Sequence, residues 1–175
     1  MIRRAATALI AALALMAAMP VLDSSDALAQ GLGFGSKGSP VNIESDELEI
    51  NEKKGTAIFT GRVEANQDKF RLSSASLEVF YNSNKEKGPT KVTQMEALGN
   101  VVIITKAQKI TGSKAFFDML KDTVTVTGDV VVTQGQNVIR GQKLLVDQKT
   151  GKTRFLSSSS SSSGRVRGLF LPSKK

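Results

Sequence analysis

The sequence predicts an all-β chain that folds as an open, twisted β-jellyroll, solenoid-like in its use of repeated antiparallel strand pairs. Three observations predict this class. The chain repeats itself, apolar and polar residues alternate within each copy, and no segment beyond the N-terminal apolar run has a helical apolar stripe. Because a single copy cannot bury its apolar face alone, neighbouring copies are expected to stack.

Two internal alignments define the repeat. A shift of 29 residues places ITG at 110–112 over IRG at 139–141. A shift of 67 residues places 43–61 over 110–128, and both segments end in Thr-Gly. Four partial copies therefore cover most of the chain, and each is expected to form a strand-turn-strand unit.

Alternation within the copies locates the strands. Small or apolar residues occupy every second position of 59–65, 97–103 and 126–132. Valine, isoleucine and threonine in such a pattern indicate strands with one buried face. A first strand is expected at 41–50. Turns are expected at 51–55, 82–88 and 147–151, where asparagine, aspartate and glycine gather.

A glycine recurs in register with the valines of these strands, as Gly61, Gly99 and Gly128. Its missing side chain permits a bend, a bulge or the close approach of another group. Two interpretations follow. The strand crosses a corner of a strongly twisted sheet, or the glycines leave space for a ligand chain between two sheets, and both can hold.

The N-terminal segment has the pattern of a secretory signal peptide. Arg3 and Arg4 precede a long apolar run, and Ala-Leu-Ala at 27–29 predicts cleavage before Gln30. The alternative is a retained membrane anchor, because the run at 5–22 approaches the roughly 20 residues that a spanning helix needs. Export without any cysteine suits a bacterial periplasm, where the fold depends on packing and hydrogen bonds.

The organisation expected from these features is simple. The signal peptide occupies 1–29, a flexible glycine-rich linker 30–40, a single β-jellyroll domain 41–173 and a short tail 174–175. Seven consecutive serines at 157–163 are expected to form a loop that returns the chain to the sheet.

Composition argues against catalysis. The chain has no histidine and no cysteine, which removes the commonest general base, thiolate chemistry and most transition-metal sites. Four acidic residues near the start lack the glycine-turn spacing of a calcium loop. We therefore expect no enzyme, no metal and no cofactor. The formal net charge of +8 favours an anionic ligand or surface, and no recognition-helix pattern supports nucleic acid.

Charge is distributed unevenly along the chain. The expected first strand is acidic, through Glu44, Asp46, Glu47 and Glu49. The last third is basic, through Arg140, Lys143, Lys149, Lys152, Arg154, Arg165 and Arg167. Stacked repeats leave unpaired edges, and opposite charges at opposite ends favour head-to-tail contact between copies. The alternative is two ordinary solvated faces, since exposed ion pairs contribute little individually.

The segment PVNIESD at 40–46, the Thr-Gly-x-Val strands at 60–63 and 127–130, and the closing segment at 164–173 together resemble the OstA-like family. The resemblance covers about 40–173. It implies a jellyroll of V-shaped section whose apolar interior shields the acyl chains of lipid A during lipopolysaccharide transport and outer-membrane biogenesis. It also implies periplasmic, head-to-tail self-association, with an inner-membrane anchored jellyroll partner (LptC-like) at the N-terminal edge and an outer-membrane assembly protein (LptD-like) at the C-terminal edge.

An exposed acyl chain costs about 0.8 kcal/mol per methylene, so a continuous apolar trough would lower the cost of crossing water. The residues expected to form this lipid-binding groove are Val41, Ile43, Leu48, Ile50, Phe59, Val63, Leu77, Val101, Ile103, Ile110, Phe117, Val126, Val130 and Leu144. The resemblance places Val41, Ile43 and Phe117 where the family's groove meets its ligand. For each position alone, core packing remains the alternative. Basic side chains at the rim could meet lipid A phosphates.

Two functional hypotheses follow. One is a periplasmic lipopolysaccharide-binding transport protein that bridges inner- and outer-membrane complexes by head-to-tail strand addition. The other is a structural β-solenoid scaffold that polymerises in the cell envelope without a lipid ligand. Both predict strand addition at the ends, so the interior has to distinguish them.

Overall fold

The structure, a computed structural model, describes residues 39–82, 91–157 and 165–171. The segments that fall outside these residues are the expected signal peptide (1–29), most of the linker (30–38), most of the turn at 82–88, the serines 158–163 and the tail. Every element of the described residues is a β-strand. No helix within this part of the chain could cross a membrane.

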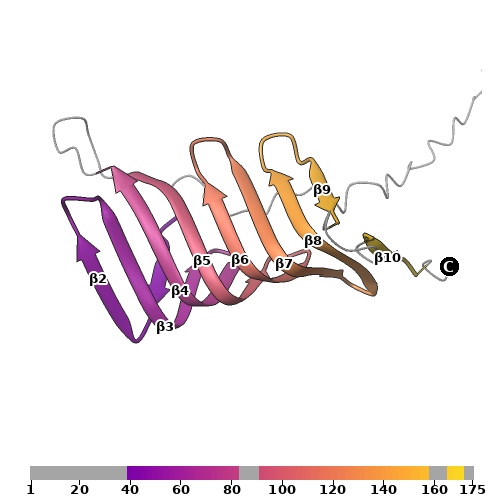
Figure 1. Ribbon diagram of the computed structural model, residues 1–175, viewed down its shortest axis with the longest axis horizontal. Helices are drawn as coiled ribbons and strands as arrows, with labels where there is room; N and C mark the ends of the chain where they lie inside the picture. Colours follow the sequence, from indigo (N-terminus) through magenta and orange to yellow (C-terminus); the bar gives the residue numbers. More distant parts are fainter. Residues whose placement is uncertain (1–38, 83–90, 158–164, 172–175) are drawn as a thin grey trace, which may run out of the picture.

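The strands are β1 (Asn42–Glu44), β2 (Glu47–Asn51), β3 (Thr56–Gln67), β4 (Phe70–Asn82), β5 (Lys91–Ile104), β6 (Lys109–Asp118), β7 (Thr123–Gln134), β8 (Asn137–Asp147), β9 (Thr153–Leu156) and β10 (Arg167–Leu169). In the described residues they form one sheet in the order β1-β3-β4-β5-β6-β7-β8-β10. β2 also pairs with β3, and β9 also pairs with β8. All pairs are antiparallel, so the predicted all-β open jellyroll is confirmed (Figure 1).

Glycines bend the long strands. Gly61, Gly99 and Gly128 have φ angles of +78°, +78° and +83°, and the residue after each also has a positive φ. At each of these sites the register shifts by one residue, which is a β-bulge. A Cβ on Gly99 would lie 2.8 Å from the Cβ of Ala75, an exposed residue on the neighbouring strand. The glycines therefore form corners, and a neighbouring side chain takes up the space that each leaves.

The bulges divide the sheet into two leaves, named here by their edge strands. The β2–β9 leaf comprises β2, β9 and residues 56–60, 76–82, 91–98, 114–118, 123–127 and 143–147. The β1–β10 leaf comprises β1, β10 and residues 63–67, 70–74, 101–104, 109–112, 130–134 and 137–141. The long strands pass from one leaf to the other, and Figure 1 shows them curving over at the bends.

The predicted first strand at 41–50 is divided in the structure. β1 and β2 both pair with β3, on opposite sides of its bulge at Gly61. The corner between them is held by Asp46, whose backbone N–H donates to the Gly61 carbonyl at 3.0 Å. The edge must turn here because its partner turns.

The hydrophobic core lies between the leaves. One cluster of buried side chains contains residues of both leaves. Phe70 of the β1–β10 leaf meets Phe117 of the β2–β9 leaf edge to face, with ring centroids 6.1 Å apart. The two leaves are therefore packed against each other, side chain to side chain.

Candidate functional site

Three interior rows run across the strands, because residues directly opposite each other in antiparallel pairs share a face. On the β2–β9 leaf, one row is Leu48, Phe59, Leu77, Ala97, Ala115, Val126, Leu144 and Phe155, and the next is Ile50, Ala57, Val79, Met95, Phe117, Val124 and Val146. On the β1–β10 leaf, the row is Ile43, Ala65, Leu72, Ile103, Ile110, Val132 and Ile139. The interior is therefore apolar from one edge of the sheet to the other.

Most of the predicted groove residues meet in this interior. Those exposed by 1% or less are Val63, Leu77, Val101, Ile103, Ile110, Phe117, Val126, Val130 and Leu144. Ile43 and Phe59 are partly buried and pack against the same cluster. The structure thus brings eleven of the fourteen together, while their contact with lipid stays a prediction.

The other three predicted residues lie at the N-terminal end and are exposed. Val41, Leu48 and Ile50 are exposed by 40%, 49% and 59%. Leu48 and Ile50 belong to interior rows, but β2 is an edge strand and no further strand covers them in the part of the chain that the structure describes. Their exposure reflects a missing neighbour.

The predicted groove set leaves out part of the core. Alternation placed Ala65, Ala97 and Val132 on the apolar face, and the structure buries them. The buried apolar residues that the sequence did not locate are Phe70, Leu72, Val79, Met95, Ala115, Val124 and Val146. Along β4 the inward positions are Phe70 and Leu72 and then Leu77 and Val79, so the alternation changes phase at the bend. The glycines at 61 and 99 on the neighbouring strands are the signal that could have located this change.

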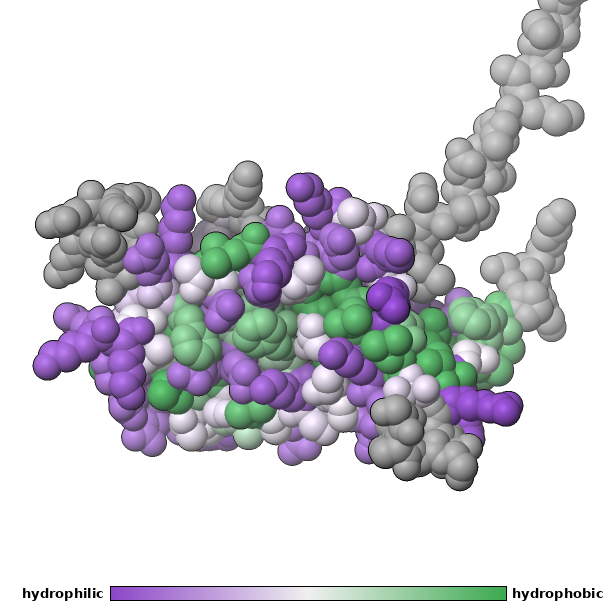
Figure 2. All heavy atoms as spheres, turned by 45° about the horizontal axis from the view of Figure 1, so that its top comes forward, coloured by the Kyte–Doolittle hydropathy of each residue, from purple (hydrophilic) through white to green (hydrophobic). Residues whose placement is uncertain are grey.

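The C-terminal end is also apolar and exposed. Val166, Leu169, Phe170 and Leu171 are exposed by 41% to 59%. Figure 2 shows apolar side chains in a broken band along the molecule, densest toward the end that carries β8 and β10. Unpaired edge strands beside apolar side chains are surfaces that another strand can cover.

The acidic residues on and between β1 and β2 do not all have the same surroundings. Asp46 accepts hydrogen bonds from the Nε of Arg62, at 2.9 Å from its Oδ1, and the two form an ion pair. This hydrogen bond holds the pKa of Asp46 below its ordinary value. Asp46 is therefore neutralised within its own chain, whereas Glu44, Glu47 and Glu49 are exposed along the edge.

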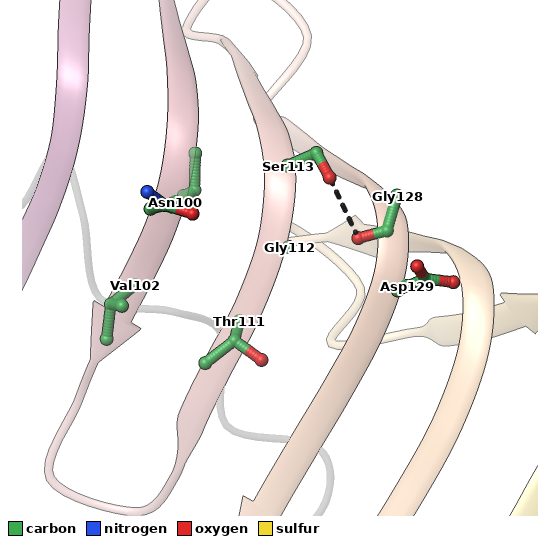
Figure 3. Close-up of a pocket in the computed structure, with 8 residues that line it drawn as sticks. Asn100, Val102, Thr111, Gly112, Ser113, Gly128 and Asp129 are labelled. Carbon is green, nitrogen blue, oxygen red and sulfur yellow. Dashed lines mark hydrogen bonds between the residues drawn. The ribbon is translucent and has the colours of Figure 1, made fainter.

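A shallow depression of about 290 Å³ lies at the bends of β5, β6 and β7. Figure 3 shows polar side chains around it, including Asn100, Thr111, Ser113 and Asp129. Ser113 Oγ donates to the Gly128 carbonyl at 3.4 Å, and Asp129 Oδ1 accepts from Gln142 at 2.7 Å. Within the described residues no group of three histidine, cysteine, aspartate or glutamate side chains could hold a metal. This depression is shallow and open to solvent, so an acyl chain lying in it would stay exposed to water.

Fold and interior together define an open β-jellyroll whose apolar core runs between two edges that no further strand of the described residues pairs. The family model described as LptA/(LptD N-terminal domain) LPS transport protein matches residues 42–152. The chain belongs to this family of lipopolysaccharide transport proteins, which confirms the OstA-like resemblance.

Two further comparisons identify a relative and a solved structure of the same fold. An uncharacterized protein of Rhizobium meliloti (strain 1021) is 30% identical over 145 residues, which are 81% of this chain and 77% of the relative. The crystal structure of LptH from Pseudomonas aeruginosa matches with a TM-score of 0.64 and 18% identity, over 76% of this chain and 96% of LptH. LptH is described as the LptA-homologous periplasmic component of the lipopolysaccharide transport device. At this identity the likeness shows the fold alone.

Proposed function

We propose that this protein is a periplasmic lipopolysaccharide-binding transport protein that shields lipid A acyl chains between its two leaves. It bridges inner- and outer-membrane complexes by head-to-tail strand addition and is not an enzyme. The observation that carries the proposal is the set of apolar rows that cross the whole sheet and reach both unpaired edges. The family assignment supports the choice of lipopolysaccharide as the ligand.

Lipid binding in the interior requires the leaves to separate. Leu77, Phe117 and Val126 are each 0% exposed, so an acyl chain reaches them only where the packed leaves part. The glycine corners act as the hinge, and the Phe70–Phe117 contact breaks on opening. Each buried methylene of the incoming acyl chain contributes about 0.8 kcal/mol toward the cost of opening.

The unpaired edges are the docking sites for partners. An LptC-like jellyroll of the inner membrane adds at β1 and β2, and an LptD-like outer-membrane protein adds at β9 and β10. Eight strands on the main path at about 4.8 Å spacing span roughly 35 to 40 Å, so several copies join to cross the periplasm. Exposed basic side chains near the C-terminal edge are available for lipid A phosphates.

The scaffold hypothesis keeps one observation in its favour, which is the full burial of nine predicted groove residues in a packed core. A core that never opens would serve a polymer with no ligand. Lipid contact in the interior therefore decides between the two functions.

Photo-crosslinking in the exporting cell tests the proposal. A photoreactive residue is placed at Ile43, Phe117 or Val130, and at Thr125 as control, because Thr125 lies on the outer face opposite Phe116 and Leu145. Lipopolysaccharide adducts at the three inward positions and none at Thr125 are expected. Folded protein with protein-only adducts, or with none, would refute the lipid conduit and leave the scaffold.

A further inference from the structure

We propose that the two ends of the chain specify one register for a second copy of the same chain. In this register, β10 pairs with the next copy's β1 so that Arg167 lies opposite Glu44. At the same time β9 pairs with β2 so that Arg154 lies opposite Glu49. The inference rests on the proposed head-to-tail assembly and adds the alignment of the strands and the force that selects it.

Each end of the sheet carries a like-charge pair on the same outer row. Glu44 of β1 lies directly opposite Glu64 of β3, and Arg167 of β10 lies directly opposite Arg140 of β8. The register across the intervening strands connects Glu64 to Arg140 through one continuous row. All four side chains are exposed, and none takes part in an ion pair within the described residues.

Like charges directly opposite each other destabilise a strand pair, so an isolated copy retains repulsion at both ends. A second copy removes it. Added in the proposed register, the row reads Arg140, Arg167, then Glu44 and Glu64 of the next copy. Each unfavourable pair then gains a neighbour of opposite charge.

Strand direction allows this addition. β1 runs antiparallel to β3, and β10 runs antiparallel to β8, so the eight strands of the main path alternate in direction from end to end. A second copy stacked in the same orientation therefore presents its β1 antiparallel to β10. The ladder continues without a reversal.

The β2–β9 leaf matches in the same register. Glu49 and Arg154 end one outer row, through Ile58 on β3 and Leu145 on β8. On the adjoining interior row, Leu48 of the next copy lies opposite Phe155. Leu48 is half exposed in the single copy, so strand addition covers it and extends the apolar row.

A second copy in this register also covers the inward face of the β1–β10 leaf at its edge. Gly168 ends the interior row that begins with Ile43. A Cβ on Gly168 would lie 2.6 Å from Cε2 of Phe170, so the Phe170 ring occupies the inward space beside this glycine. Phe170 is 59% exposed, and Ile43 of an incoming copy would cover it.

Other alignments lose these contacts. A head-to-head pair sets Glu44 edges against each other, and a tail-to-tail pair does the same with Arg167. A slip by one residue turns the outer charges inward. A slip by two residues on the β2–β9 leaf can set Arg154 opposite Glu47, but both proposed ion pairs form together only in the direct register.

Cysteine pairs test the register, since the chain has no native cysteine. The variant Glu44→Cys with Arg167→Cys places directly opposite positions about 4.5 to 5.5 Å apart between copies. The matched control, Asn42→Cys with Arg167→Cys, is offset by two residues on the same face, at about 7 to 8 Å. Disulfides form below about 7 Å between Cα atoms, so a copy-to-copy ladder on a non-reducing gel is expected for the first variant alone. Equal or faster linkage of the control would overturn the register.

Exchange of charges between the two ends tests whether the proposed ion pairs stabilise the junction. Glu44→Arg with Glu49→Arg, and Arg154→Glu with Arg167→Glu, are each expected to weaken self-association roughly tenfold. Mixed in equal amounts, the two variants present opposite charges at every junction and are expected to assemble like the parent chain. A mixture that associates no better than either variant alone would overturn the proposal.

Lipid capture separates this inference from the proposed function. Lipopolysaccharide binding by dilute, unassembled parent chain is measured in parallel. Retained lipid capture with failed register tests overturns the register alone. Loss of lipid capture by the folded parent chain overturns the proposed function, whatever the gel shows.

Discussion

The middle of the sheet and its two ends are built from the same rows, yet they differ in what covers them. Leu77 and Leu48 lie on one interior row, and Leu77 is 0% exposed whereas Leu48 is 49% exposed. Both are leucines on the inward face of a strand. The difference lies in the neighbouring strands, which Leu77 has on both sides and Leu48 on one. The edge strands therefore carry inward-facing apolar side chains that a neighbouring strand covers on one side only.

The largest effect is expected from truncating the middle of a row. Leu77→Ala should lower the free energy of unfolding by about 2 to 5 kcal/mol, because it removes buried methyl groups and leaves a cavity. Leu48→Ala in a dilute single copy should cost less than about 1 kcal/mol, since a half-exposed leucine has little packing to lose. Urea unfolding of both variants makes the comparison. Equal losses would show that the two positions are equally packed in solution.

A corner glycine should have the next largest effect. Gly99→Ala forces a side chain into a left-handed backbone and against the Cβ of Ala75, at an expected cost of about 2 to 4 kcal/mol. Gly135→Ala is the matched control, because Gly135 also has a positive φ but has nothing within 4 Å of the place that an added Cβ would take. That control should cost only about 1 to 2 kcal/mol.

A second substitution separates the clash from the backbone strain. Ala75→Gly in the Gly99→Ala background should recover part of the lost stability, because it removes the opposing Cβ. No recovery in thermal or urea unfolding would mean that strain alone explains the loss.

These corners also explain how far the sequence could predict the structure. Alternation correctly located Val63, Val101 and Val130 in the core, because the inward phase of β3, β5 and β7 continues through the glycine corner. It missed Leu72 and Val79 together, since the phase of β4 changes between them, opposite bulges on the adjoining strands. A pattern read along one strand contains no information about an extra residue on its neighbour.

Unpaired ends were expected from the stacked repeats, but the exposure of individual residues could not be predicted, for a related reason. Residues 41–50 carry apolar side chains that alternation assigns to a buried face, and the structure divides the segment into two short edge strands around the Gly61 corner. Burial depends on a neighbouring strand, and the residues that the structure describes supply none at this edge. Sequence period therefore predicts which residues face inward but not which are covered.

The smallest effect on stability is expected from replacing Asp118 and Asp147, two aspartates at equivalent positions of the 29-residue repeat. Asp147 Oδ1 accepts from the backbone N–H groups of Thr150 and Lys149 at 2.9 and 3.0 Å. The hydrogen bond from Thr150 lowers its pKa. Burial raises the pKa of Asp118, but hydrogen bonds from Lys121 outweigh it, and the net shift is also downward.

A folded-state pKa below the unfolded value means that each carboxylate stabilises the fold above about pH 4 and loses this contribution as the pH falls further. Asp118→Asn and Asp147→Asn should each flatten the loss of stability between about pH 4 and pH 2. Asp118, which is buried and also paired with Lys121 at 3.2 Å, should have the larger effect. Urea unfolding at a series of pH values measures the stability of both variants. If both lose stability between about pH 4 and pH 2 as steeply as the parent chain, the two carboxylates do not stabilise the fold in this way.

The most direct measurement asks whether the leaves must part for lipid to bind. Phe70→Cys with Phe117→Cys places a thiol on each leaf where the rings now meet, and a short bis-maleimide can bridge them. The same double-cysteine variant left unbridged serves as control. We expect bridging to lower lipopolysaccharide capture well below that of the unbridged variant. Capture by the bridged protein at the level of the unbridged variant would contradict an interior that opens to shield lipid.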